Sequence, residues 1–224
     1  LWQQIRTEGQ GWSVAKSFKS HSDLVAQMLD QLITMADLYG LQLDEDVGTH
    51  YLIDVAVSEL PSVLEGLGKI RAHGTGMIAQ RDVSEAQHFQ SLYLIADFQS
   101  TLKSLQNHLT RVRQHNSAYD ARLMRSAVVI DAAAADFTAV ATQQMLDRMF
   151  SLTPEAYFAR VTQSIDVIYG ELFETFHPVV DDMLRDRYRR TLQKTAIVVG
   201  LVLLLLLALG YVALGAYLAV MHNI

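Results

Sequence analysis

The residues best suited to chemistry lie together in one segment, 41–71, LQLDEDVGTHYLIDVAVSELPSVLEGLGKIR. It opens with an acidic turn and contains a proline inside a helical pattern. Carboxylates, a phenol and a guanidinium can hold a polar ligand through charge-assisted hydrogen bonds. Two interpretations stay open: a solvated acidic turn before an amphipathic helix, or a turn and bent helix that shape a ligand pocket or a signalling kink. The candidate ligand-binding residues are Asp44, Asp46, Tyr51, Asp54 and Arg71.

Patterns typical of catalysis or metal binding are missing from the sequence. With no cysteine there is no disulfide framework, thiolate metal site or cysteine nucleophile. No two histidines have the i, i+4 spacing of a helical zinc site, and Gly74-Thr75-Gly76 follows no predicted strand, which argues against a phosphate loop. No nucleophile elbow is present. We therefore expect no enzyme activity, no cofactor and no metal. The scattered histidines include His21, His50, His73, His88, His108, His115 and His177.

The elements that must position these residues are helices, because apolar residues recur at spacings of three and four. A first helix ends near Tyr39-Gly40. A second is predicted for 49–80, and Pro61 should bend it. In the first helix the recurring apolar residues are Val25, Met28, Leu32 and Met35.

Three further helices follow from capping signals. The third should begin at a capping box over 82–85, and the fourth after the turn at Asn116-Ser117, extending through Met149. Thr153-Pro154 is a strong start for the last helix. This helix should continue through a kink at Pro178 without a stop signal.

The fold class predicted from this pattern is all-α, an up-down antiparallel helical bundle with a C-terminal transmembrane helix continuous with the last bundle helix. We expect three regions: 1–20, a poorly defined remnant of a truncated helical region; 21–190, the bundle; and 195–220, the transmembrane helix. The chain does not begin with Met, and we expect it to be a fragment of a longer protein.

The membrane assignment depends on 195–220, which carries no charged side chain over 26 residues. A bilayer core about 30 Å thick needs roughly 20 apolar helical residues. Gly215 and Ala219 form a small-xxx-small pair that would let two membrane helices pack closely. A basic cluster that could rest on lipid headgroups precedes the span: Arg185, Arg187, Arg189, Arg190 and Lys194.

The net charge of −6 argues against a nucleic-acid partner. The basic cluster lies before the span, so the positive-inside rule alone would place the bundle in the cytoplasm. Long domains can translocate regardless of charge, and an upstream membrane helix could fix the orientation. The two sides therefore stay open on charge alone.

One resemblance bears on function. The pattern LxLDxDxxxxYLxDxxxxxLPxxxxxLGxxR resembles the extracytoplasmic sensing regions of proteobacterial membrane receptors: methyl-accepting chemotaxis receptors, sensor histidine kinases and diguanylate cyclases. These regions are distantly similar to nitrate- and nitrite-sensing helical domains, in which arginines hold the anion, and this implies Arg71 as an anion contact. The matching residues are Leu43, Asp44, Asp46, Tyr51, Leu52, Asp54, Leu60, Pro61, Gly68 and Arg71.

The resemblance implies a sensory input region in the bacterial inner membrane, with the bundle in the periplasm and a cytoplasmic signalling domain of the same chain beyond Ile224. It implies a homodimer and, as a stimulus, a small molecule, an anion or a periplasmic binding protein. The alternative is a tail-anchored structural or interaction protein that senses no ligand. The sequence after Ile224 would separate the two.

Overall fold

A computed structural model gives the fold of the chain and describes all residues except 42–46, 82, 116–118, 223 and 224. The described residues form helices and no strand, so the all-α fold class is confirmed. The chain divides into two units, Leu1–Val180 and Asp181–Ile224. The predicted turn residues Asp44 and Asp46 and the predicted cap Asn116-Ser117 lie outside the described residues.

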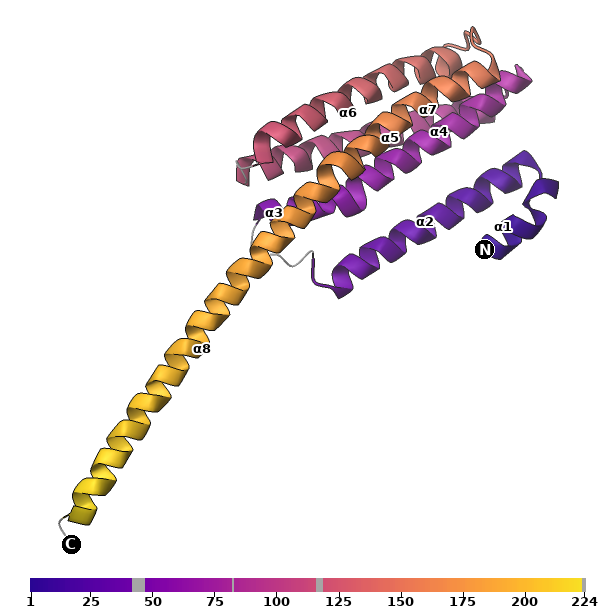
Figure 1. The fold of residues 1–224 in the computed structure, drawn as a ribbon. Coiled ribbons are helices and arrows are strands. Elements are labelled where there is room, and N and C mark those ends of the chain that lie inside the picture. Colours follow the sequence, from indigo (N-terminus) through magenta and orange to yellow (C-terminus); the bar gives the residue numbers. More distant parts are fainter. Residues whose placement is uncertain (42–46, 82, 116–118, 223–224) are drawn as a thin grey trace. The chain divides into compact units, whose positions relative to one another are not determined.

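The first unit contains a four-helix bundle (Figure 1). One edge is a continuous helical stretch of α3 (Val47–Asp54), the π-helical turn η2 (Val55–Glu59) and α4 (Leu60–Gln80). It packs against α5 (Glu85–His115), which packs against α6 (Asp120–Ala141). The fourth helix, α7 (Pro154–Glu171), lies between α6 and α4 and closes the ring.

Apolar side chains at helical spacing fill the bundle because each helix buries one stripe. Phe98 of α5 and Phe137 of α6 meet edge to face with ring centroids 5.1 Å apart. Tyr157 of α7 is fully buried, and its hydroxyl donates to the Ile70 carbonyl of α4. Tyr157 fits only because Gly74 has no side chain, since a Cβ there would lie 2.7 Å from Tyr157 Cε1. Close packing of the Tyr157 ring against α4 therefore requires a glycine at position 74.

Both internal prolines follow a π-helical turn in the same register. The Leu60 amide bonds to the Val55 carbonyl five residues back, and Pro61 comes next. In η5 (Leu172–Phe176) the His177 amide bonds to the Leu172 carbonyl, and Pro178 comes next. A proline lacks an amide hydrogen and clashes with the carbonyl four residues back, and a widened turn just before it removes that conflict. A π-turn thus precedes Pro61, and the bend predicted there stays a prediction.

Two predicted boundaries need correction. The capping box of α5 is formed by Ser84 and Gln87: the Ser84 amide donates to Gln87 Oε1 at 3.0 Å, and the Gln87 amide donates to Ser84 Oγ at 3.3 Å. The predicted box over 82–85 was two residues early. Helix α6 ends in a third π-turn, η4 (Thr142–Leu146), so the prediction that this helix extends through Met149 was wrong.

The start of α7 is confirmed. The Thr153 hydroxyl accepts a hydrogen bond from the Ala156 amide at 3.2 Å, and Pro154 occupies the first turn, where its missing amide hydrogen costs nothing. Helix α7 runs through η5 into α8 (His177–His222) without a break. The prediction that the helix continues past Pro178 is therefore confirmed.

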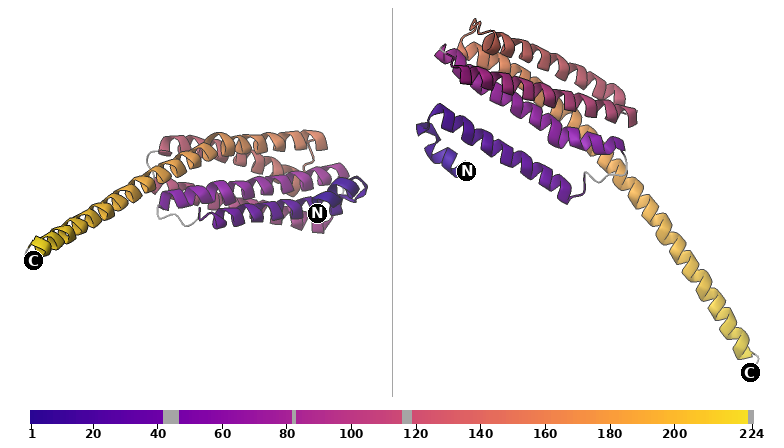
Figure 2. Two further views of the ribbon diagram at one scale, coloured as in Figure 1. Left: turned by 60° about the horizontal axis from the view of Figure 1, so that its bottom comes forward. Right: turned by 180° about the vertical axis from the view of Figure 1, so that it is seen from behind.

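The N-terminal residues form α1 (Trp2–Glu8), a 3₁₀ turn η1 (Gly9–Gly11) and α2 (Val14–Leu38). Helix α2 begins at Val14, inside the expected remnant 1–20, after a Ser13 cap that accepts from the Lys16 amide. It lies beside α4 (Figure 2) and contacts none of α5, α6 or α7 extensively. Much of its predicted apolar stripe is exposed, including Met28, Leu32 and Met35.

The second unit, Asp181–Ile224, is the greater part of α8. Among the described residues, one helix is long and apolar enough to cross a membrane: its most apolar 18-residue window has a mean hydropathy of 3.0, and none of that window is buried. An apolar surface of this length exposed to water would be unfavourable, whereas lipid accommodates it.

Candidate functional site

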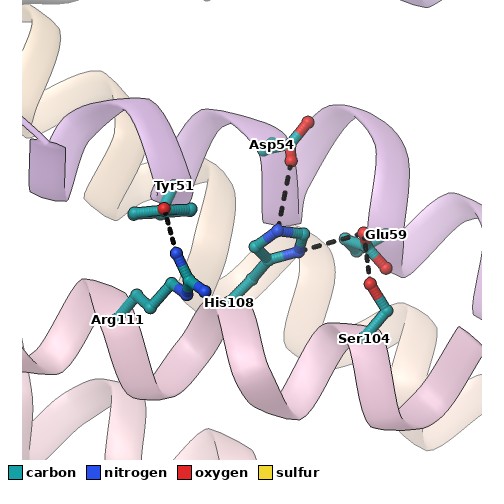
Figure 3. A network of polar contacts seen from close by, with 6 residues as sticks. All are labelled: Tyr51, Asp54, Glu59, Ser104, His108 and Arg111. Carbon is teal, nitrogen blue, oxygen red and sulfur yellow. Dashed lines mark hydrogen bonds and ion pairs between the residues drawn. The ribbon is translucent and has the colours of Figure 1, made fainter.

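A cluster of polar and ionisable side chains is built on the π-turn η2. Asp54 and Glu59 are five residues apart, and in a regular α-helix they would point about 140° away from each other, at 100° per residue. A π-turn joins residue i to residue i+5 and brings such a pair toward the same face. As a result, both carboxylates face α5 (Figure 3).

His108 of α5 projects between these carboxylates (Figure 3). Its Nδ1 lies 3.0 Å from Glu59 Oε1, and its Nε2 lies 3.6 Å from Asp54 Oδ2. The Ser104 hydroxyl, one turn earlier on α5, donates to Glu59 Oε1 at 2.9 Å. The three ionisable side chains are 14–27% exposed, so the cluster is half-buried at the surface of the bundle.

Tyr51 and Arg111 continue the cluster along the same two helices. The ring of Tyr51 packs on the imidazole of His108 with centroids 5.4 Å apart and planes inclined by 31°. The Arg111 guanidinium donates to the Tyr51 hydroxyl and lies 5.1 Å from its ring centroid. These contacts restrain the plane of the imidazole.

The charges of this cluster are not balanced by a neutral imidazole. Such a ring carries one N–H and can donate to one carboxylate only, whereas each ring nitrogen of His108 faces a carboxylate oxygen. Asp54 and Glu59 repel each other unless a positive charge lies between them. A bound cation would supply it.

Arg71 is placed elsewhere. It lies 17 residues after Asp54 on the same helical stretch, which corresponds to about 25 Å at 1.5 Å per residue. Its guanidinium donates to Thr162 Oγ1 of α7 at 2.9 Å and stacks 4.5 Å from the Phe158 ring centroid. Of the candidate residues, the structure therefore brings together Tyr51 and Asp54 and keeps Arg71 apart.

Arg71 lines a cavity of about 470 Å³ between α2 and α4. Its walls combine aromatic side chains, Trp12 and Phe18, with the charged groups of Glu65 and Lys69. Burial raises the pKa of Glu65, and the Lys69 ammonium 3.4 Å away opposes this shift. Cavities of this volume are typical of small-molecule sites.

Sequence reasoning missed Glu59, Ser104, His108 and Arg111. Three of them follow the i, i+4, i+7 spacing of one helical face on α5, but nothing in the sequence indicated which helix that face would meet. Pro61 could have pointed to this pair. A π-turn lies just before Pro61, and such a turn brings the carboxylates of Asp54 and Glu59, five residues apart, toward one face.

The remaining predicted site residues belong to the second unit. Arg185 forms an exposed ion pair with Asp181 at 2.9 Å. A Cβ at Gly215 would meet no heavy atom within 4 Å, so this position leaves room for a neighbouring helix. The packing role of Gly215 and Ala219 and the lipid role of the basic cluster stay predictions.

Comparison with known proteins gave no match: no family model, no curated protein and no solved structure is significantly similar to this chain.

Proposed function

We propose that this chain is the sensory input and transmembrane signalling region of a bacterial membrane receptor. The observation that supports it best is the unbroken run of helix from α7, whose side chains fill the bundle core, through η5 into the apolar length of α8. A rigid helix shared between a bundle and a membrane span can transmit a small shift or rotation. The resemblance of segment 41–71 to bacterial receptor sensing regions points the same way.

In this proposal the bundle has two arrangements of similar free energy, and a stimulus shifts the balance by its differential affinity for them. The π-turn η5 lies in the transmitting helix just before Pro178. A π-turn within an α-helix is a common site of functional adjustment, because one extra residue per turn can be gained or lost there. Candidate stimulus sites are the Asp54–His108 cluster and the cavity beside Arg71.

We propose a homodimer that associates through α2. Heptad numbering of this helix, with Phe18, Val25 and Leu32 at position a, places Met28, Leu32 and Met35 on one exposed stripe of a and d residues. Earlier members of the stripe, Phe18, His21 and Val25, line the cavity toward α4 instead. Met28 and Met35 on this stripe are 59% and 56% exposed. Every charged residue of α2 falls at the outer positions b or f: Lys16, Lys19, Asp23, Asp30 and Asp37.

The dimer can be tested in a chain that has no cysteine of its own. Met28→Cys should form a disulfide between two copies in oxidised native membranes, because residues at a parallel helical interface face their own counterparts. Asp30→Cys, on the outer face of the same helix, should stay monomeric. Equal cross-linking of both variants, or of neither, would argue against this interface.

We propose that the bundle lies outside the cytoplasm, in the periplasm of a bacterial inner membrane. The resemblance supports this orientation, and the basic cluster before the span opposes it. Added protease should degrade the bundle in intact spheroplasts. Protection of the bundle until the membrane is broken would reverse the orientation.

Signal transmission is tested by joining residues 1–224 to the cytoplasmic part of a sensor kinase. One alanine inserted after Leu192 rotates everything downstream by about 100°, whereas seven residues restore the phase to within about 20°. Kinase output should change strongly with one inserted residue and return with seven. Equal kinase output with one and with seven inserted residues would refute transmission through this helix.

A further inference from the structure

We propose that Asp54, Glu59 and His108 form a binding site for a divalent transition-metal ion, with Zn²⁺ as the best match. The site joins the π-turn η2 to α5 (Figure 3). The proposal that these residues bind a metal depends only on the contacts of their side chains. The proposal that the metal is a stimulus depends in addition on the proposed sensory function.

The distances among these side chains are compatible with one shared metal ion. One ring nitrogen of His108 and one oxygen from each carboxylate lie within 4.8 Å of one another. Four ligands at about 2.0–2.2 Å from Zn²⁺ in tetrahedral arrangement lie about 3.3–3.6 Å apart. The contacts of 3.0 Å to Glu59 and 3.6 Å to Asp54 are already near this spacing, although they involve different ring nitrogens. A metal ion on one ring nitrogen would require the carboxylate that now faces the other nitrogen to turn toward it.

An unsatisfied atom points to the same place. His108 Nδ1 is inaccessible to water and lies 3.0 Å from Glu59 Oε1, but it makes no hydrogen bond to any of the described residues. Buried polar atoms without partners are uncommon, and an unseen ion is one standard reason for them. A metal bond would satisfy this nitrogen.

The supports expected around a metal ligand set are also present. Ser104 donates to the Glu59 carboxylate and so fixes the direction of its oxygens. The ring of Tyr51 packs on the imidazole and restrains its plane. All three ligands stand on helices, which hold side chains more precisely than loops do.

The ligand set selects among metals. Imidazole favours Zn²⁺ and its transition-metal neighbours, whereas Mg²⁺ and Ca²⁺ prefer sites built from oxygen alone. Two carboxylates and one neutral imidazole carry a charge of −2, which a divalent ion neutralises. Three protein ligands leave a position open for water, and the partial exposure of the side chains gives an ion access.

The test is calorimetric titration of ZnCl₂ into the full chain in detergent, after removal of metals with a chelator. We expect one saturable site per chain, with affinity lowered at least tenfold by His108→Ala and by Glu59→Gln, which keeps the shape of the side chain. His115→Ala, at an exposed histidine in the last turn of α5, should bind as the unaltered chain does. Circular dichroism shows whether each variant keeps its helices, and the second variant serves if the first does not fold.

Absence of saturable Zn²⁺ binding would overturn the proposal, as would unchanged affinity in folded His108→Ala or Glu59→Gln. Ca²⁺ binding tighter than Zn²⁺ binding would overturn the assignment to a transition metal. The kinase chimera separates this site from the sensory function: Zn²⁺ that binds without changing kinase output removes the stimulus role and leaves the metal site.

Discussion

Replacing Gly74 with alanine should destabilise the bundle, although alanine is the better helix former. In an unobstructed helix interior this change gains about 0.5–1 kcal/mol. Here the new Cβ would lie 2.6 Å from Tyr157 Cζ and 2.7 Å from Cε1, far inside normal contact. Tyr157 is fully buried, so its ring cannot move aside without displacing the core or losing its hydrogen bond to Ile70.

Overpacking of this kind typically costs about 1–3 kcal/mol, which leaves a net loss of up to about 2.5 kcal/mol after the gain in helix propensity. For a domain of this size each kcal/mol shifts the Tm by about 2–4 °C. Thermal unfolding of Gly74→Ala followed by circular dichroism should therefore show a Tm up to about 10 °C lower than that of the unaltered chain.

Gly76 is the matched control, since it lies two residues further along α4 and a Cβ there meets nothing within 4 Å. Gly76→Ala should raise the Tm. Combining Gly74→Ala with Tyr157→Phe should cost less than the sum of the two single changes, because the closest clash involves the Tyr157 hydroxyl. A Tm that rises in Gly74→Ala, or strictly additive effects, would refute the proposed seating of the ring.

Three further outcomes are expected. Burial raises the pKa of Glu65 above 4.5. The contribution of Glu65 to stability is therefore full below pH 4.5 and is lost as the pH rises through the folded-state pKa. Glu65→Gln should have a higher Tm than the unaltered chain at about pH 7 but not at about pH 4. Burial lowers the pKa of His73 below 6.5. The contribution of His73 to stability is therefore lost as the pH falls from 6.5 through the folded-state pKa. Between about pH 7 and pH 5 the Tm of His73→Gln should fall less than that of the unaltered chain, and an equal fall would contradict this. Leu206→Arg, in the middle of the apolar run, adds about 2.5–3.5 kcal/mol to insertion and should increase the carbonate-extractable fraction; unchanged extraction would argue against a span.

Much of the fold could be predicted from the sequence because helices depend on near neighbours. The cap at Thr153-Pro154 sets the start of α7 through contacts within one turn, and the structure places it where predicted. The end of α6 was missed for a related reason. Apolar spacing continues to Met149, but the helix widens at η4 and ends, and the two left-handed residues that follow, Arg148 and Phe150, are neither glycine nor asparagine and gave no stop signal.

The candidate site was less accessible to sequence reasoning. Tyr51 and Asp54 both reach the cluster around His108 because they are three residues apart on one helix, and their role in ligand binding stays a prediction. Arg71 was grouped with them by closeness in sequence, yet 17 helical residues separate it from Asp54 and direct it to Thr162 of α7. The spacing rule used for metal sites examined only pairs within one helix, so it could not find His108.

By itself the sequence determined the helical class, the helix start at Thr153 and the apolar run over 195–220, because each is written in residues close together along the chain. Tertiary structure alone decided that α5 meets η2, that His108 enters between Asp54 and Glu59, and that Met28 and Met35 stay exposed. The physical reason is that hydrogen bonding and apolar periodicity act over one or two turns. Which helical faces meet depends instead on how all the helices share one core.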